Sequence, residues 1–187
     1  MVGASWGGLD AIGSLLSRLP RDFPAAVVVV QHRSEDSRGG RLEAILGSRG
    51  GLPVREIDDK DACEPGAAYV APAGYHLFVE NGSFALTVED RVRYSRPSID
   101  VAFESAADAY GDRLIAMVLT GASEDGAAGL LAVRARGGIT VVQDPATALK
   151  PEMPQAALDA GGAMKVLALE DMAPFLIAAC GGERRAA

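Results

Sequence analysis

The stretch AAVVVVQ, residues 25–31, decides which fold this sequence can adopt. It is a near-continuous apolar run with four consecutive valines, which is typical of a strand covered on both faces. Such strands occur in parallel sheets that carry helices on both sides. Helices are predicted on either side of it, because apolar residues recur at helical spacing over residues 8–19 and glycines bound a helical pattern over residues 38–51. The stretch therefore predicts an α/β fold.

The same alternation of short β-branched runs and helical patterns extends along most of the chain. Residues 66–90 differ, because their strands are short and Asn81-Gly82 is a strong hairpin signal. We therefore predict a doubly wound, mainly parallel sheet with an antiparallel excursion at residues 66–90 and helices on both faces. The further elements expected are a first strand at 2–4, helices at 98–110, 127–136 and 154–159, strands at 113–120, 138–143 and 165–169, and a last helix.

Composition excludes several classes of protein. A chain of 187 residues suits one domain, and its net charge of −7 argues against a broad electrostatic grip on nucleic acid or an anionic membrane. Cys63 and Cys180 form no metal-ligand pattern and are interpreted as ordinary thiols of a reducing compartment. The N-terminus lacks a signal-peptide pattern, and no apolar run is long enough to span a bilayer. A cytoplasmic protein without membrane insertion is expected.

A Gly-X-Ser-X-Gly motif follows the first predicted strand, with Ser5 at its centre. Such a turn can expose a nucleophilic serine, and it can equally be a structural or phosphate-binding turn. A nucleophile needs a base, and the chain has two histidines, His32 and His76. His32 directly follows the strand at 25–31, and residues just past the ends of neighbouring parallel strands line one crevice. We expect Ser5 and His32 to meet if those strands pair, and His76 to be a surface or packing residue.

The acidic partner of His32 is expected from the loop after the strand at 113–120. That loop carries two adjacent carboxylates, Glu124 and Asp125, and Asp125 is preferred because it precedes a glycine-rich turn into a helix. A buried carboxylate that accepts the Nδ1 proton would fix the imidazole tautomer and stabilise the imidazolium. The hypothesis is a triad of Ser5, His32 and Asp125. Taken singly, His32 can be a strand-end histidine that binds a backbone carbonyl, and Asp125 a helix N-cap.

Seven segments of the sequence occur together in an order and spacing that resemble one known family. They are GASWGG, VVVVQHRS, APAGYHL, RPSID, LTGASEDGAAG, VQDPATA and EMP. Over nearly its whole length the chain resembles the catalytic domain of the CheB chemoreceptor protein-glutamate methylesterases. The resemblance implies that Ser5 is the nucleophile, His32 its base and Asp125 the acid that orients the base. The oxyanion hole is expected from the amide of Trp6 and one amide of the Gly121-Ala122 loop.

The resemblance also implies a function. It is hydrolysis of glutamate γ-methyl esters on chemoreceptor cytoplasmic helices in bacterial chemotaxis adaptation, with deamidation of selected glutamines. The implied partners are methylated chemoreceptor cytoplasmic domains and a separate receiver-domain regulator, and no metal or organic cofactor is needed. An alternative is a catalytically weak binding module that recognises receptor or other helical partners. A nucleotide-binding Rossmann-type domain is disfavoured, because no acidic residue closes a second strand where a ribose would bind.

The sequence departs from the family pattern in several places. Trp6 stands where members often have a small residue or Thr, and residues 120–123 read Thr-Gly-Ala-Ser where members commonly have Thr-Gly-Met-Gly. Both changes are expected to reshape the substrate cleft and leave the triad intact. The first strand is expected to be short through a late start or a truncation. A single catalytic domain is expected over residues 1–182, without the receiver domain that many members carry and with a frayed tail at 183–187.

Overall fold

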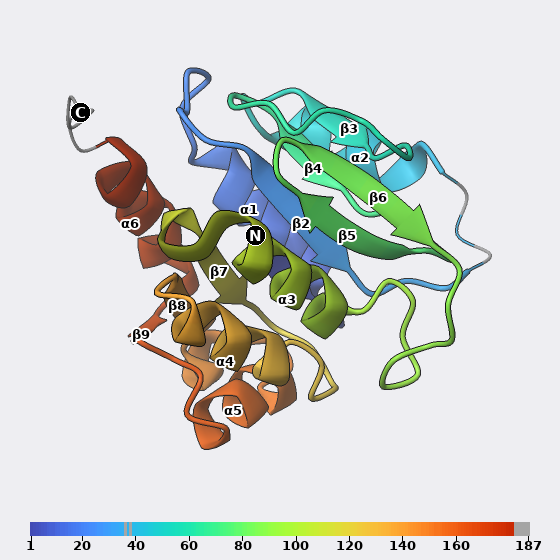
Figure 1. Cartoon of the computed structure of the whole chain (residues 1–187). Coiled ribbons are helices and arrows are strands. Elements are labelled where there is room, and N and C mark those ends of the chain that lie inside the picture. The colour runs from blue at the N-terminus through green and yellow to red at the C-terminus, as the bar shows by residue number, and fades with distance from the viewer. Residues whose placement is uncertain (36, 38, 182–187) are drawn as a thin grey trace.

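The computed structural model describes residues 1–35, 37 and 39–181, and its centre is a seven-stranded parallel sheet (Figure 1). The strand order is β3-β4-β2-β1-β7-β8-β9, and every neighbouring pair is parallel. The predicted doubly wound, mainly parallel architecture is confirmed. The strands are β1 (Val2–Ala4), β2 (Val27–Gln31), β3 (Val54–Glu56), β4 (Ala68–Val70), β7 (Ile115–Val118), β8 (Ile139–Gln143) and β9 (Lys165–Leu167).

The predicted hairpin forms a separate antiparallel pair, β5 (His76–Glu80) and β6 (Ser83–Thr87). Its turn contains Gly82 at φ 88°, a backbone conformation that favours glycine. The prediction is wrong for β4, which lies in the excursion predicted at residues 66–90 but pairs in parallel with β2 and β3. β3 was not predicted at all. Within the predicted excursion, the antiparallel part is therefore the segment from His76 to Thr87.

Helices and the hairpin cover the two faces of the sheet in separate groups (Figure 1). The hairpin, α3, α4 and α5 pack on one face, where Phe103 and Phe84 belong to one apolar cluster. α1, α2 and α6 pack on the other face, where Ile12, Leu46 and Met172 belong to a second cluster. The helices are α1 (Gly8–Ser17), α2 (Arg41–Arg49), α3 (Ile99–Tyr110), α4 (Ala127–Ala135), α5 (Glu152–Asp159) and α6 (Leu169–Gly181), with 3₁₀ turns at Gly111–Arg113 and Pro145–Thr147.

The central position of β1 determines where a site can form. Gly3 pairs with Val30 of β2 on one side and with Val118 of β7 on the other. The loops after all three strands therefore leave the same edge of the sheet, where open α/β folds bind ligands. A Cβ at Gly3 would lie 2.5 Å from Cγ2 of Ile99, so glycine lets α3 lie directly against β1. This contact brings the start of α3 to that edge as well.

Among the helices of the described residues, none is long and apolar enough to cross a membrane. Cys63 and Cys180 are both free thiols. The predicted tail at residues 183–187 lies outside the described part of the chain.

Candidate active site

Ser5 lies in the turn between β1 and α1. Its amide donates to the carbonyl of Thr120 at 3.0 Å, and its carbonyl accepts from Nε2 of Gln31 at 2.8 Å. The left-handed conformation of this turn falls on Gly7, at φ 81°, and Ser5 is outside that region. The motif is therefore a strand-to-helix turn in which a glycine, not the serine, adopts the unusual backbone. Bonds from β2 and from the end of β7 fix the position of Ser5.

His32 directly follows β2, on the next step of the ladder that pairs Ala4 with Gln31. Its amide donates to the carbonyl of Ala4 at 2.9 Å, so the ladder continues one residue beyond the strand. Adjacent strands lie about 4.8 Å apart, so Ser5 and His32 project from neighbouring backbone positions. The pairing of the first two strands, on which the expected meeting of these residues depended, is present in the structure.

The imidazole of His32 contacts the carboxylate of Asp125. Nε2 of His32 lies 2.7 Å from Oδ2 of Asp125, and both side chains are largely or fully buried. The predicted nitrogen is wrong, because Nε2 and not Nδ1 faces the acid. The carboxylate of Asp125 lies at the N-terminus of α3. Of the two ring nitrogens of His32, Nε2 is farther from the backbone, and it is the one that reaches this carboxylate. Nδ1 instead faces the hydroxyl of Ser95, at 3.3 Å.

Asp125 also accepts hydrogen bonds from the beginning of α3. The donors are the Ser98 hydroxyl at 2.9 Å, the Ile99 amide at 2.7 Å and the Asp100 amide at 3.0 Å. Burial acts to raise the pKa of Asp125, but the bond from His32 and the two amide bonds outweigh it and hold the pKa below its usual range. The carboxylate is therefore ionised at neutral pH. Nε2 of His32 then carries the ring proton of the neutral imidazole, and Nδ1 carries the lone pair.

Asp100 makes the reciprocal contact with α4. Its Oδ1 accepts from the amides of Gly126 at 2.8 Å and Gly129 at 2.7 Å, and its Oδ2 accepts from Nε of Arg93 at 3.1 Å. The alternative interpretation of Asp125 as a helix cap is thus partly correct, but the helix it caps is α3, while Asp100 caps α4. Burial raises the pKa of Asp100, and repulsion from Asp125 adds to that rise.

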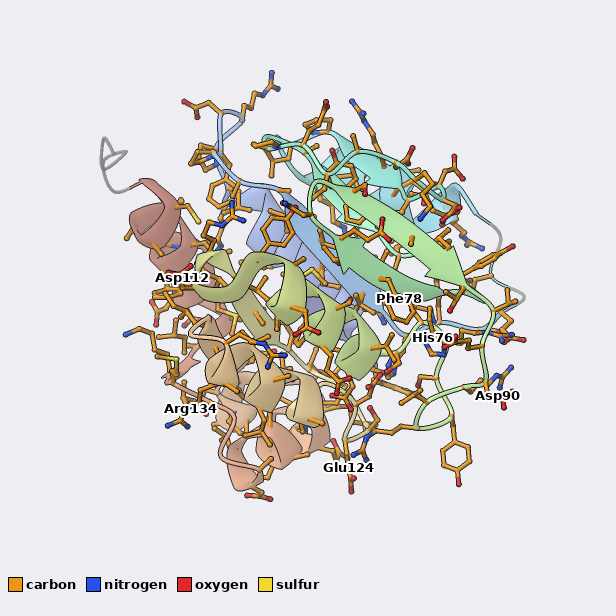
Figure 2. All side chains as sticks on the ribbon, in the orientation of Figure 1. His76, Phe78, Asp90, Asp112, Glu124 and Arg134 are labelled. Atoms are coloured by element: carbon orange, nitrogen blue, oxygen red, sulfur yellow. The ribbon has the colours of Figure 1, made fainter. Side chains whose placement is uncertain are left out.

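Glu124 and His76, the alternatives to Asp125 and His32, make other contacts. Glu124 is 74% exposed, pairs with Nη1 of Arg93 at 2.9 Å and points outward from the loop before α4 (Figure 2). His76 is buried, with Nε2 3.0 Å from the carbonyl of Asp90, and its Nδ1 accepts from the amide of Ser98 at 3.2 Å. His76 is therefore a packing residue, which supports the backbone from which Ser98 reaches Asp125.

The predicted oxyanion donors divide into two cases. The amide of Gly121 donates to the carbonyl of Lys150 at 3.1 Å, so this amide is not an oxyanion donor in this structure. The amides of Trp6 and Ala122 remain the predicted donors. A Cβ at Gly121 would lie 2.8 Å from the Cβ of Ser5 and 1.9 Å from Sδ of Met153. Glycine is therefore needed for the loop after β7 to approach Ser5.

Trp6 is 65% exposed, and Nζ of Lys150 lies 5.9 Å from the centre of its ring. Its carbonyl accepts from the hydroxyl of Thr120 at 2.9 Å, which ties the turn after Ser5 to the end of β7. The role of Trp6 in the substrate cleft stays a prediction. In the described part of the chain, no group of three or more His, Cys, Asp or Glu side chains is placed to hold a metal ion.

A cavity of about 310 Å³ opens beside His32. Arg91 and Arg96 line it and share the carboxylate of Glu35, each at 2.9 Å, so the loop at 91–96 is joined to the loop after β2. This loop, and the support that Ser98 and Asp100 give to the acid, were not predicted from the sequence. One signal was present, because a serine three residues before Val101 at a helix start is a recognisable N-cap.

Comparisons with known proteins identify the family of the chain. The profile of the family described as CheB methylesterase matches residues 1–176. A Leptospira interrogans protein, provisionally named protein-glutamate methylesterase/protein-glutamine glutaminase, is 41% identical over 95% of this chain and 92% of its own length. A Cupriavidus metallidurans protein named protein-glutamate methylesterase/protein-glutamine glutaminase 2 is 42% identical over 98% of this chain, which spans 54% of that relative.

A solved structure gives the same result for the fold. The crystal structure of the Thermotoga maritima CheB methylesterase catalytic domain aligns with a TM-score of 0.89 and 33% identity, covering 95% of this chain and 96% of that one. Sequence profile, relatives and fold therefore agree over almost the same residues. The chain belongs to the CheB methylesterase family.

Proposed function

We propose that this protein is a serine esterase that hydrolyses glutamate γ-methyl esters on the cytoplasmic helices of chemoreceptors, and that it also deamidates selected glutamines. The observation that carries the proposal is the 2.7 Å contact between His32 and the buried, ionised Asp125, on the sheet edge where Ser5 follows β1. Membership of the CheB methylesterase family and the names of these relatives support the substrate class.

The acylation step uses all three residues. Nδ1 of His32 takes the proton of Ser5 as its Oγ attacks the ester carbonyl, and the imidazolium that forms is stabilised by Asp125. The tetrahedral intermediate then collapses, the bond to the methoxy group breaks, and methanol leaves with the proton from His32. The product of this step is a glutamyl ester of Ser5.

Deacylation repeats the chemistry with water. His32 takes a proton from water, the hydroxide attacks the acyl-enzyme carbonyl, and Ser5 leaves with the proton from the imidazolium. The product is a free glutamate side chain. With a glutamine substrate the same acylation releases ammonia in place of methanol. The amides of Trp6 and Ala122 are the proposed oxyanion donors, and loss of one such donor costs about 10²–10³ in kcat.

The proposal extends to partners and location. The substrates are methylated chemoreceptor cytoplasmic domains, a separate receiver-domain protein is a proposed regulator, and the site of action is the cytoplasm. Residues 1–182 act as one catalytic domain. The family profile over residues 1–176 supports this unit.

The test is methanol release from methylated receptor membranes. We expect Ser5→Ala to reduce release by about 10⁴-fold or more, because triad members act as a unit. His32→Ala should lose nearly as much, and the double variant little more than either. Ser17→Ala is the matched control, since its exposed hydroxyl bonds only to a carbonyl of its own helix. Receptor binding without methanol release by the unmodified protein would identify a binding module and refute the esterase proposal.

A further inference from the structure

The hydroxyl of Ser95 is hydrogen-bonded to Nδ1 of His32, the nitrogen that accepts the Ser5 proton in the proposed reaction. Its Oγ lies 3.3 Å from Nδ1, while Nε2 is bound to Asp125. Because Asp125 is an acceptor, Nε2 carries the proton, and Nδ1 can only accept. Ser95 is therefore the donor in this contact. No role was predicted for Ser95 from the sequence.

We propose that Ser95 competes with Ser5 for the single lone pair on Nδ1 of His32, and so sets the fraction of the protein that is ready to react. This inference rests on the proposed roles of Ser5 and His32. A neutral imidazole has one in-plane acceptor, so both hydroxyls cannot make a strong bond to it at once. The Ser95 hydroxyl must turn away before Ser5 can transfer its proton.

The backbone holds Ser95 firmly at this position. Val92 and Ser95 exchange two backbone hydrogen bonds, at 3.2 and 2.9 Å, around a turn whose central residues are Arg93 and Tyr94. Both central residues have positive φ, 47° and 63°, although neither is glycine. Residues in such conformations persist only where the surrounding structure holds them, and they cluster at functional sites.

Ion pairs attach this turn to the site from two sides. On one side Arg91 and Arg96 bind Glu35 in the loop after β2. On the other side Arg93 binds both Asp100 and Glu124, next to the catalytic acid proposed above. The turn is therefore joined to the loops that carry both His32 and Asp125. Rotation of the Ser95 hydroxyl alone, without movement of the turn, is enough to release Nδ1.

The first experiment measures the reactivity of Ser5 directly, with phenylmethanesulfonyl fluoride as the probe. Labelling of Ser5 is followed by peptide mass spectrometry at about pH 8.5, where an ordinary histidine is neutral. We expect Ser95→Ala to be labelled about three- to tenfold faster, the factor for loss of one competing hydrogen bond. Ser95→Thr keeps the hydroxyl and should match the unmodified protein. Equal or slower labelling of Ser95→Ala would overturn the proposal.

The second experiment measures the ¹⁵N chemical shift of Nδ1 of His32 by NMR, in which His76 is the only other histidine of the sequence. Ser95→Ala removes the donor from the Nδ1 lone pair, so the Nδ1 signal should move toward that of an imidazole nitrogen without a hydrogen bond. The charged groups around His32 are Asp125 at Nε2 and, lining the adjoining cavity, Arg33, Glu35, Arg91 and Arg96. All of these are unchanged in the variant. A purely structural role for Ser95 predicts no change in the Nδ1 signal, and an unchanged signal would refute competition.

The esterase proposal and the competition by Ser95 can be refuted independently of each other. The backbone bonds of the turn do not use the Ser95 side chain, so Ser95→Ala keeps the turn. Faster labelling of Ser5 in Ser95→Ala, together with no methanol release from receptor membranes by either protein, would refute the proposed substrate and support the competition. Methanol release that depends on Ser5, with labelling unaffected by Ser95→Ala, would support the esterase and refute the competition.

Discussion

The starts of α3 and α4 are built alike, yet their carboxylates behave in opposite ways. Asp125, which precedes α4, binds the N-terminus of α3, and Asp100, in the first turn of α3, binds the N-terminus of α4. Both side chains are buried. The pKa of Asp125 nevertheless lies below its usual range, and that of Asp100 lies above it. The same burial and the same kind of helix contact thus give two different acids.

The difference lies in the other donors that each carboxylate has. Asp125 has donors on both oxygens, namely His32 and Ile99 on Oδ2 and the Ser98 hydroxyl and the Asp100 amide on Oδ1. Asp100 has its two amides on one oxygen, and the other meets the partly exposed Arg93. Burial acts to raise the pKa of both acids, and the donors on both oxygens of Asp125 outweigh it, whereas those of Asp100 do not.

The largest expected effect is that of Asp125→Asn on catalysis. Because both oxygens of Asp125 accept, the amide NH₂ of asparagine must face a donor, and the imidazole is no longer held in the required tautomer. We expect kcat for methanol release to fall by about 10⁴, the size of the corresponding change in a serine protease. Circular dichroism checks that the fold is retained. A loss of less than tenfold would remove Asp125 from the proposed triad.

Asp100→Ala should affect stability more than Asp100→Asn. Alanine leaves the amides of Gly126 and Gly129 without their acceptor, at a cost of about 1–3 kcal/mol for each buried group. We expect the free energy of unfolding in urea to fall by about 2–4 kcal/mol. In Asp100→Asn the side-chain oxygen can still accept from both amides, and the NH₂ group faces Arg93. The loss of unfolding free energy should therefore stay at about 1 kcal/mol. Equal losses for the two variants would show that the amide contacts contribute little.

The pH dependence of stability should differ in sign between the two acids. The lowered pKa of Asp125 stabilises the fold above the unfolded value of about 3.9, and this contribution is lost as the pH falls through the lower folded pKa. The raised pKa of Asp100 gives a contribution that is complete below about 3.9 and is lost as the pH rises through the folded pKa.

Urea unfolding between about pH 3 and pH 7 measures both contributions. Relative to the unmodified protein, the deficit of Asp125→Asn should shrink as the pH falls below about 3.9. Asp100→Asn should gain relative stability as the pH rises above about 3.9. Difference curves with the same slope for both variants would contradict the opposite pKa shifts.

The smallest expected effect is that of Glu124→Gln. This side chain is exposed and contacts Arg93, and exposed ion pairs contribute about 0–1 kcal/mol. We expect kcat to change by less than about twofold and the unfolding free energy by less than about 0.5 kcal/mol. The variant is the adjacent-residue control for Asp125→Asn. A severe loss of methanol release in Glu124→Gln would show that Glu124, and not Asp125, is the catalytic carboxylate.

Much of this geometry could be predicted from strand ends alone. The valine-rich run of β2 and the glycine-rich turn after β1 place Ser5 and His32 at one edge, because parallel neighbours end on the same side. The parallel pairing of β4 and the presence of β3 could not be predicted in the same way, because β4 lies close to the hairpin signal and β3 has one apolar residue among its three. Their place in the sheet is set by tertiary pairing.

The nitrogen that faces Asp125 and the contact of Ser95 also escaped prediction. The first depends on the position of Asp125 at the start of α3. The second depends on a turn with Arg93 and Tyr94 in the left-handed region, where glycine or asparagine would be the recognisable signal. Asp100 was equally inconspicuous, because an acid in the first turn of a helix is common. Its bonds to α4 come from the packing of two helices, which a local pattern does not record.

The central place of β1 has a consequence for biosynthesis. Val2 pairs with Val29 on one side but with Met117 on the other, so one edge of β1 stays unpaired until most of the chain has left the ribosome. Closing a loop of that length is slow, and an unpaired apolar strand can associate with other chains. A nascent chain that stops before β7 therefore has an open sheet edge and lacks Asp125, the proposed catalytic acid. The ester chemistry proposed for the protein can begin only after β7 and the loop that follows it are made.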